Sequence, residues 1–246
     1  MKHPNARVPK FIKKRLLFLN RSFDSIDRLI MGLSKTQIKI IEAAEIEFAE
    51  MGYAGASIRE ITNRAGVNIA AINYHFGSKE ALYKEMVLYH IEPINVVRMK
   101  LLDEALAKND SKPLPLKEVV DIIVRPLLST LISESCNKFH FMRAMGKGMA
   151  EERDFMKDIQ KDLLKDILPK FISAISDSLG NPHFEKIAYG MHFLTCSIVG
   201  AMMQHTRLGI VSGGQIDLND VDGLVDHLVA FISAGLKAVS EVNPRN

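Results

Sequence analysis

The sequence predicts an all-α protein with a small N-terminal three-helix unit and a larger helical body. Apolar residues recur at spacings of three and four along most of the chain, and no segment alternates apolar and polar residues for long enough to require a strand. Turn-forming glycine, proline and asparagine residues separate the periodic stretches. The chain has 246 residues, of which 47% are hydrophobic and 25% charged, so it can bury a core in one large domain or two modest ones.

The net charge of +3 is distributed unevenly. Residues 1–33, the N-terminal arm, contain eight Lys and Arg against two Asp and carry +6, whereas residues 34–83 carry −1 and residues 84–246 carry −2. A basic arm favours contact with nucleic acid or another anionic surface, with a solvated tail as the alternative. Its apolar residues follow helical spacing, which predicts packing on the body, on a partner or on a membrane surface: Ile12, Leu16, Leu19, Phe23, Ile26 and Ile30. Met31 is an alternative translation start.

Several classes of protein do not fit this composition. Two cysteines, Cys136 and Cys196, exclude a disulfide framework and a zinc site built mainly from thiolates, and they suit a cytoplasmic location. We expect neither a secretory signal nor a membrane span. The most apolar stretch, Ile187 to Met203, falls short of a bilayer span and contains His192, so we expect a buried helix in the core or at a dimer seam.

Residues 35–76 predict three helices in close succession. The first runs from Lys35 to Met51, and Gly52 is placed to end it in a left-handed cap. A capping box from Ser57 to Glu60, in which the hydroxyl accepts an amide and the glutamate reaches back, predicts the start of the second.

The second helix is expected to end at Ala65, with a tight turn at Gly66 and Val67. Asn68 would cap the third helix, from Ile69 to Phe76. A capped helix, a short turn and a second short helix are typical of the helix-turn-helix, whose second helix enters the DNA major groove.

The helical pattern continues to the C-terminus, giving about nine helices after the arm. Pro93 is expected to divide two helices, Pro126 to kink one and Pro169 to bend another. Loops are expected at 109–115, 180–182 and 213–214, and helices at 83–92, 94–108, 116–134, 137–149, 152–179, 183–208 and 219–241.

The segment from Gly66 to Tyr83 resembles the TetR family of bacterial transcriptional regulators. It is GVNIAAINYHFGSKEALY, and the upstream residues Ile40 to Phe48, Gly52, Ser57, Ile61 and Ala65 also match that family's core and capping positions. The residues from Asn68 to Phe76 and from His192 to Leu194 are similar to the sequences of the sub-branch that includes fatty-acid-responsive repressors.

The resemblance implies a homodimeric repressor that binds a palindromic operator in double-stranded DNA and is released by a small-molecule effector, possible classes being fatty acids and acyl-CoA. It divides the chain into the arm (1–33), a DNA-binding head (34–83) and a ligand-binding and dimerisation body (84–246). No cofactor or metal is expected. Asn73 departs from the tyrosine that the family often has there, which alters the base-reading surface.

DNA contacts are expected from the helix N-termini, the recognition helix and the start of the next helix. Arg59 can reach a phosphate or a base edge, Asn73 can pair with adenine and Ala71 can touch a thymine methyl group. Ile72 and Phe76 are expected in the core. The predicted DNA-binding residues are Ser57, Arg59, Asn68, Ala70, Ala71, Asn73, Tyr74, His75 and Lys79.

Residues 116–149 and 187–208 are rich in Met, Leu, Ile and Phe and predict the walls of an apolar pocket, with ordinary core packing as the alternative. Arg143 is the strongest candidate, because a buried arginine would need an anionic partner such as a carboxylate or acyl-thioester ligand. The predicted ligand-binding residues are His140, Phe141, Arg143, Met145, His192, Phe193 and Cys196.

Three other functions remain open from the sequence. An enzyme is disfavoured because no phosphate loop, nucleophile elbow or paired-carboxylate motif is visible. A redox-responsive DNA-binding regulator would use Cys136 or Cys196. A protein-interaction module would use the helix-turn-helix without binding duplex DNA.

Overall fold

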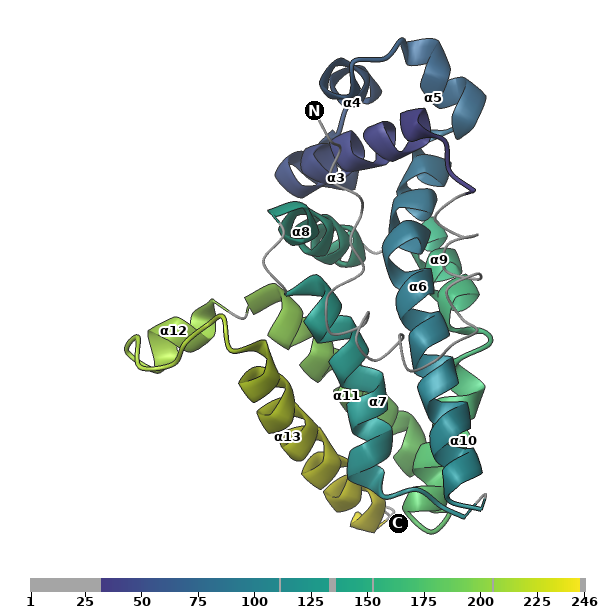
Figure 1. Ribbon diagram of the computed structural model, residues 1–246, viewed down its shortest axis with the longest axis vertical. Helices are drawn as coiled ribbons and strands as arrows, with labels where there is room; N and C mark the ends of the chain where they lie inside the picture. The colour runs from purple at the N-terminus through teal and green to yellow at the C-terminus, as the bar shows by residue number, and fades with distance from the viewer. Residues whose placement is uncertain (1–31, 111, 133–135, 152, 205, 244–246) are drawn as a thin grey trace. The chain divides into compact units, whose positions relative to one another are not determined.

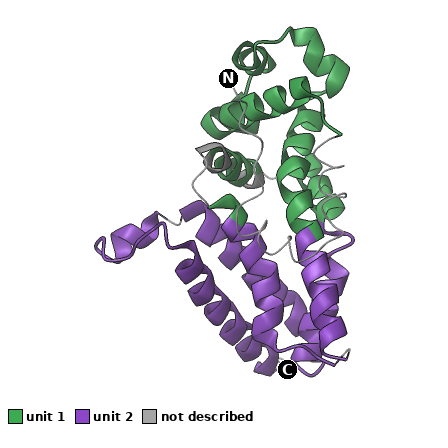
Figure 2. Ribbon diagram, in the orientation of Figure 1, with its two compact units in different colours: residues 1–96, 130–163 green, residues 97–129, 164–246 purple. Residues whose placement is uncertain are grey.

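The computed structural model describes residues 32–110, 112–132, 136–151, 153–204 and 206–243, and in this part of the chain it has eleven helices, α3 to α13, and no strand (Figure 1). The predicted all-α class is therefore confirmed. The prediction of an amphipathic arm helix lies outside the described residues. The chain divides into two compact units, one from residues up to 96 with 130–163, the other from residues 97–129 and 164–246 (Figure 2).

The three predicted N-terminal helices are present as α3 (Lys35–Gly55), α4 (Ile58–Ala65) and α5 (Ile69–His75). They enclose a core of aliphatic and aromatic side chains that are fully or almost fully buried: Ile40, Ile41, Phe48, Ile61 and Ile72. Their burial fixes the short helices α4 and α5, since helices of seven or eight residues are marginal without tertiary packing.

The capping box predicted at Ser57 is wrong. The Ser57 side chain makes no capping hydrogen bond, and its backbone N–H donates to Glu47 Oε1 at 3.1 Å. The Glu47 carboxylate is buried and reaches from α3, so it takes the position that Glu60 would have filled. A complete capping box instead opens α3, where Ser34 and Gln37 exchange hydrogen bonds at 2.9 and 3.2 Å.

Pro93 does not divide the chain into two helices. One helix, α6 (Lys79–Lys108), passes through it without interruption and contributes to both units. The proline costs a backbone hydrogen bond, but buried residues on both sides of it, including Ile91, Ile94 and Leu102, hold the helix in place.

The first unit is completed by α8 (Cys136–Ala150) and α9 (Asp154–Leu164). Helix α8 packs extensively on α3. The Tyr83 hydroxyl of α6 is buried and donates to the Ala144 carbonyl of α8 at 3.1 Å. The first long helix, α3, is thus joined to α8 by an extended packed contact.

The second unit contains the end of α6 and four helices of the body: α7 (Leu116–Leu131), α10 (Leu168–Ser178), α11 (Phe184–Gln204) and α13 (Val221–Glu241). A short helix, α12 (Arg207–Val211), lies between α11 and α13 and was not predicted. Pro169 does not bend a continuous helix: α9 ends at Leu164, and Pro169 lies in the first turn of α10. This position tolerates proline because the first amides of a helix have no intrahelical partner.

Helices α11 and α13 pack against each other along apolar faces. The buried face of α13 consists of Val225, Val229, Ile232 and Leu236, and α11 contributes Ile187, Leu194, Ile198 and Met202. By length and composition alone, α13 would suffice to cross a membrane. Its packing on α11 accounts for the apolar residues of its buried face, while other apolar residues of α13, such as Phe231, are exposed.

Arg125 of α7 holds α13 by ion pairs. Its guanidinium contacts Asp121 on its own helix at 2.7 Å and Asp222 and Asp226 of α13 at 3.0 and 2.5 Å. Hydrogen bonding to Arg125 lowers the pKa of the Asp226 carboxyl below its ordinary value. Several carboxylates around one guanidinium form a network, which contributes more than an isolated surface pair.

Replacing Arg125 with glutamine should lower the stability of the second unit at neutral pH. The folded-state pKa of Asp226 is depressed, so this stabilisation is present above the unfolded-state pKa and is lost as pH falls through the folded value. The difference in urea midpoint between wild type and Arg125→Gln should therefore shrink below about pH 4. Lys165→Gln, at an exposed position, is the control; a midpoint difference that stays constant down to pH 2 would contradict the role of the carboxylates.

Candidate nucleic-acid interface

Helix α5 presents small and polar side chains to solvent. Ala70, Asn73 and Tyr74 are exposed, with Tyr74 at 85%, whereas Ile72 on the opposite side is only 1% exposed. Ala71 is half-buried beside them. This division leaves one face free for a partner and anchors the other in the head, as a recognition helix requires.

The turn between α4 and α5 has the backbone geometry that the sequence predicted. Gly66 has φ +66° and ψ 37°, and the Val67 amide donates to the Thr62 carbonyl at 3.1 Å, which ends α4 in a Schellman motif. Asn68 caps α5 by accepting the Ala70 amide at 3.0 Å. Its carboxamide oxygen therefore orients the recognition helix, and its NH₂ group is the part that could meet DNA.

Helix α4 carries two arginines in different environments. Arg64 forms ion pairs within the head, with Glu50 at 2.6 Å and with Glu47 at 3.6 Å. Arg59, in the first turn of the helix, is exposed. Because Ser57 makes no side-chain cap, the first amides of α4 are not occupied by its hydroxyl, and this end of the helix is suited to an anion.

Lys79 supports the head as well as carrying charge. Its ammonium group donates to the Ala56 carbonyl at 2.6 Å and the Ala54 carbonyl at 3.4 Å, and it lies 4.8 Å from the centre of the Tyr53 ring. Burial lowers its pKa below the ordinary value, although Glu151 acts in the opposite direction. A phosphate contact by Lys79 would therefore be made by a side chain that already holds the C-terminal end of α3.

The end of α5 carries three aromatic rings in succession. The rings of Tyr74 and His75 meet edge to face with centroids 5.0 Å apart, and His75 and Phe76 follow at 6.3 Å. Phe76 is half-buried rather than fully in the core as expected. Gly77, with φ +79°, ends the run and directs the chain into α6.

A residue that sequence reasoning missed, Glu151, fixes the end of α3. Gly52 has φ +72° and ψ 174°, so it interrupts the helix in an extended conformation rather than in the expected left-handed cap. The Glu151 carboxylate accepts the amides of Tyr53 at 2.7 Å and Ala54 at 3.2 Å, and Lys147 donates to the Glu50 carbonyl at 2.7 Å. No sequence motif predicts this contact, because Glu151 lies almost 100 residues from Tyr53 and Ala54.

The predicted ligand residues of α8 do not share one environment. Phe141 is fully buried and its ring stacks on His90 at 4.1 Å, while His140 and Met145 are half-buried. Arg143 is exposed, so the expectation of a buried arginine at this position is wrong. The helical turn that places Phe141 and Ala144 in the core directs Arg143 to solvent.

The predicted ligand residues of α11 are on its surface. Phe193 is 52% exposed, His192 and Cys196 are also exposed, and Cys196 Sγ lies 3.7 Å from His192 Nε2. They belong to the second unit, whereas α8 belongs to the first. The expected wall positions of Phe193 and Cys196 are therefore surface positions, and the side chain of Cys136 lies outside the described residues.

An arginine of the body that was not among the predicted site residues, Arg98, is buried. It is 8% exposed, its Nε donates to the Ile123 carbonyl at 2.8 Å, and burial lowers its pKa to about 10. The apolar residues that surround Arg98 in the sequence, from Ile94 to Met99, could have indicated its burial.

Two family models match the chain. One, described as bacterial regulatory proteins, tetR family, matches residues 40–86, and the other, described as tetracyclin repressor-like, C-terminal domain, matches residues 121–235. The probable HTH-type transcriptional regulator YttP of Bacillus subtilis is 44% identical over 52 residues, which is 21% of this chain and 25% of that protein. The HTH-type transcriptional dual regulator CecR of Shigella flexneri is 56% identical over 45 residues, 18% of this chain and 20% of that protein. The chain thus aligns with a quarter or less of these relatives.

Solved structures share the fold. The regulator FadR from Bacillus subtilis in complex with stearoyl-CoA has a TM-score of 0.54 at 15% identity, covering 80% of this chain and 98% of that one. A putative tetR family transcription regulator from Shewanella sp. PV-4 has a TM-score of 0.55 at 16% identity, covering 83% and 97%. At this identity the likeness shows the architecture alone.

The capped turn and the exposed helix that follows it form a helix-turn-helix, the DNA-binding element of bacterial regulatory proteins of the family that residues 40–86 match. The match of both family models to successive parts of the chain shows that it belongs to the TetR family.

Replacing Gly52 with alanine should destabilise the first unit by about 1–3 kcal/mol, because a side chain at positive φ is strained. An added Cβ would also meet Glu151 Oε1 at 2.9 Å. Urea unfolding measures the loss. Gly55→Ala is the matched control, because its Cβ would have an ordinary contact with Met51 at 3.5 Å; equal losses for both variants would contradict the special role of Gly52.

Proposed function

We propose that the protein is a homodimeric repressor that binds a palindromic operator and leaves it when a small apolar or acyl ligand binds. The head would comprise residues 34–83 and the body residues 84–246. The observation that carries the proposal is the exposed face of α5, held by a buried Ile72 and a capped turn. Repression rather than activation follows from the likeness to the family.

DNA recognition would depend on a few placed groups, since the head itself carries a net charge of −1. Asn73 would read an adenine edge and Ala71 a thymine methyl group, while Tyr74 would contact the backbone. Arg59 and the amides at the start of α4 would hold a phosphate. The +6 arm would add a sequence-independent, salt-sensitive contribution.

Replacing Asn73 with alanine should relax sequence preference, with a loss of about 1–3 kcal/mol at one base position of the operator. Replacing Arg59 with alanine should instead weaken binding to all sequences and reduce the salt slope by about one unit. Fluorescence anisotropy over a series of salt concentrations measures both effects.

The control for these variants is Asn219→Ala, which changes an exposed asparagine of the second unit. Lys79→Ala should also weaken binding broadly, but its hydrogen bonds to Ala54 and Ala56 require unfolding measurements beside it. Absence of sequence-specific duplex binding at moderate salt, with the dimer intact, would refute the proposed function.

The outer faces of α11 and α13 support the homodimer. On α11 the exposed residues step by four and three along one face: Tyr189, Phe193, Cys196, Gly200 and Met203. On α13, Phe231 is 69% exposed among small residues such as Ala234 and Gly235, and a Cβ added at Gly235 would meet no other atom. Apolar faces of this kind on adjacent helices are typical of surfaces that a partner covers, and a second copy of the chain would do so.

Replacing Phe231 with aspartate should dissociate the dimer, because a charge would be placed in the proposed apolar seam. Analytical ultracentrifugation measures the mass. Tyr74→Asp, which changes an even more exposed aromatic residue of the head, is the control and should leave the dimer intact. A Phe231→Asp variant that remains dimeric at micromolar concentration would place the interface elsewhere.

The effector is proposed to be apolar, with a fatty acid or acyl-CoA as its class. The FadR relative of known structure was solved with stearoyl-CoA, which supports a long apolar ligand in this fold. Helix α8 is suited to transmit its binding, because the same helix carries Phe141 and holds α3 through Lys147. Native mass spectrometry of the purified protein would identify a bound ligand. As a DNA-binding regulator, the protein is proposed to act in the cytoplasm.

A further inference from the structure

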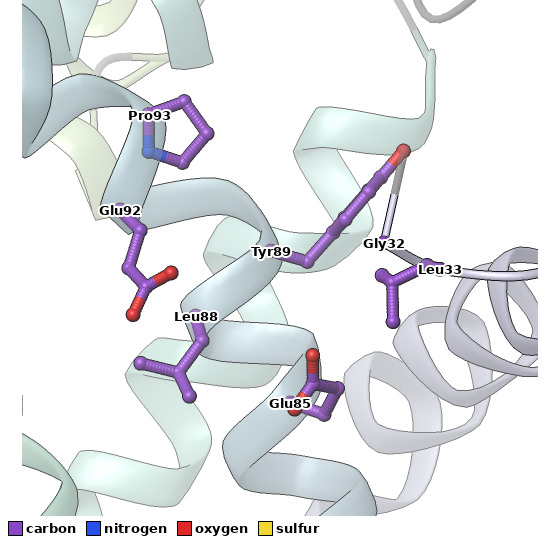
Figure 3. A pocket seen from close by; sticks show the side chains of 7 residues that line it. All are labelled: Gly32, Leu33, Glu85, Leu88, Tyr89, Glu92 and Pro93. Carbon is purple, nitrogen blue, oxygen red and sulfur yellow. The ribbon is translucent and has the colours of Figure 1, made fainter. Parts of the chain in front are cut away.

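A hollow of about 220 Å³ lies beside the point where the described chain begins. Figure 3 shows Tyr89 extending from α6 toward Gly32 and Leu33. The remaining lining residues all come from one stretch of α6: Glu85, Leu88, Glu92 and Pro93. An aromatic ring, an aliphatic surface and two carboxylates therefore meet at one place in the first unit.

The hollow is anionic. Glu85 and Glu92 are half-buried and lie seven residues apart, two turns along the same helix. Burial raises the pKa of Glu85, and the charge of Glu92 raises it further. Burial likewise raises the pKa of Tyr89, with added contributions from Glu42 and Glu45 of α3.

Lys84, the basic neighbour of Glu85 on α6, is paired with another carboxylate. Lys84 lowers the pKa of Glu85, but its ammonium group forms an ion pair with Asp162. The two carboxylates that line the hollow suit a guanidinium group, which can bind a carboxylate by two hydrogen bonds, and the Tyr89 ring in the same lining offers an aromatic face on which it can stack. The chemistry of the hollow thus favours arginine.

The residues that precede the hollow supply that chemistry. Gly32 lines the hollow, and the arm before it carries a net charge of +6. Arg28 is only four residues before Gly32, so an extended chain would let it reach about 14 Å from there. Arg21 lies a further seven residues back in the arm and supplies a second guanidinium group for the other carboxylate.

The covalent link favours this occupant over a free molecule. A segment joined to its site by a short linker has an effective concentration in the millimolar range, so even a weak ion pair is populated. The apolar stem of an arginine would also cover Leu88 while its charged end reaches a carboxylate.

We propose that the N-terminal arm docks on its own protein by placing Arg28 in the hollow between Glu85 and Glu92, against Tyr89, with Arg21 as the second contact. Docking competes with DNA for the same arginines. This competition rests on the proposed DNA-binding function, whereas the docking itself does not.

Limited trypsin digestion of the full chain, followed by mass spectrometry, tests the docking directly. Trypsin should cut after Arg28 more slowly than after Arg7, and Glu85→Gln combined with Glu92→Gln should raise the rate at Arg28 about fivefold without changing the rate at Arg7. Glu118→Gln removes an exposed carboxylate of the second unit and should change neither rate. An unchanged rate at Arg28 in the double variant would overturn the proposal.

A change within the arm keeps the test valid if the double variant folds poorly. Arg28→Gln leaves the body intact and should increase cleavage after Arg21 about twofold, because one of the two contacts is lost. An Arg21 rate equal to that of wild type would also overturn the proposal.

Non-specific duplex binding tests the competition. Glu85→Gln with Glu92→Gln should bind about threefold more tightly than wild type at low salt and have a steeper salt slope, because the arm's arginines are released. The effect should vanish in the background Arg21→Gln, Arg28→Gln. A chain that binds no DNA would refute the proposed function, while the trypsin rates would still decide whether the arm docks; an effect that persists without the two arginines would overturn the competition.

Discussion

The DNA-binding head depends on how the first long helix ends. At Gly52 the backbone adopts φ +72°, which leaves the amides of Tyr53 and Ala54 and the carbonyls of nearby residues without helical partners. Three charged side chains satisfy these groups: Glu151 accepts the amides, Lys147 donates to the Glu50 carbonyl, and Lys79 donates to the Ala54 and Ala56 carbonyls. The helix end is therefore held from α8, the chain after it and α6 at once.

This arrangement has a consequence for regulation. The groups that hold α3 do not belong to the helix-turn-helix itself, so a shift of α8 would change how the end of α3 is held. Phe141 lies on α8 and stacks on His90, which in turn contacts the buried Glu45 of α3 at 2.6 Å. Core packing and charged contacts thus connect α8 to α3, and a ligand that moved α8 would act on both.

Local patterns predicted the head because its signals lie close together in the sequence. Gly66 ends α4 and Asn68 caps α5 as expected, since a positive φ and an amide-accepting side chain are requirements of single residues. The same local reasoning failed at Ser57 and Pro93. A buried Glu47 from another helix replaced the predicted capping box, and core packing outweighed the hydrogen bond that Pro93 cannot donate.

The sequence by itself determined the helical class, the helix-turn-helix, the family resemblance and the concentration of positive charge in the arm, because periodicity, capping and charge are local properties. Only the tertiary structure decided which side chains meet. It placed Arg143 in solvent and Arg98 in the core, exposed Phe193 and Cys196, and brought Glu151 to Gly52. It also formed the acidic hollow on α6 beside the entry of the arm. Burial and contact between residues distant in sequence arise from the packing of helices against one another, and no local pattern specifies that packing.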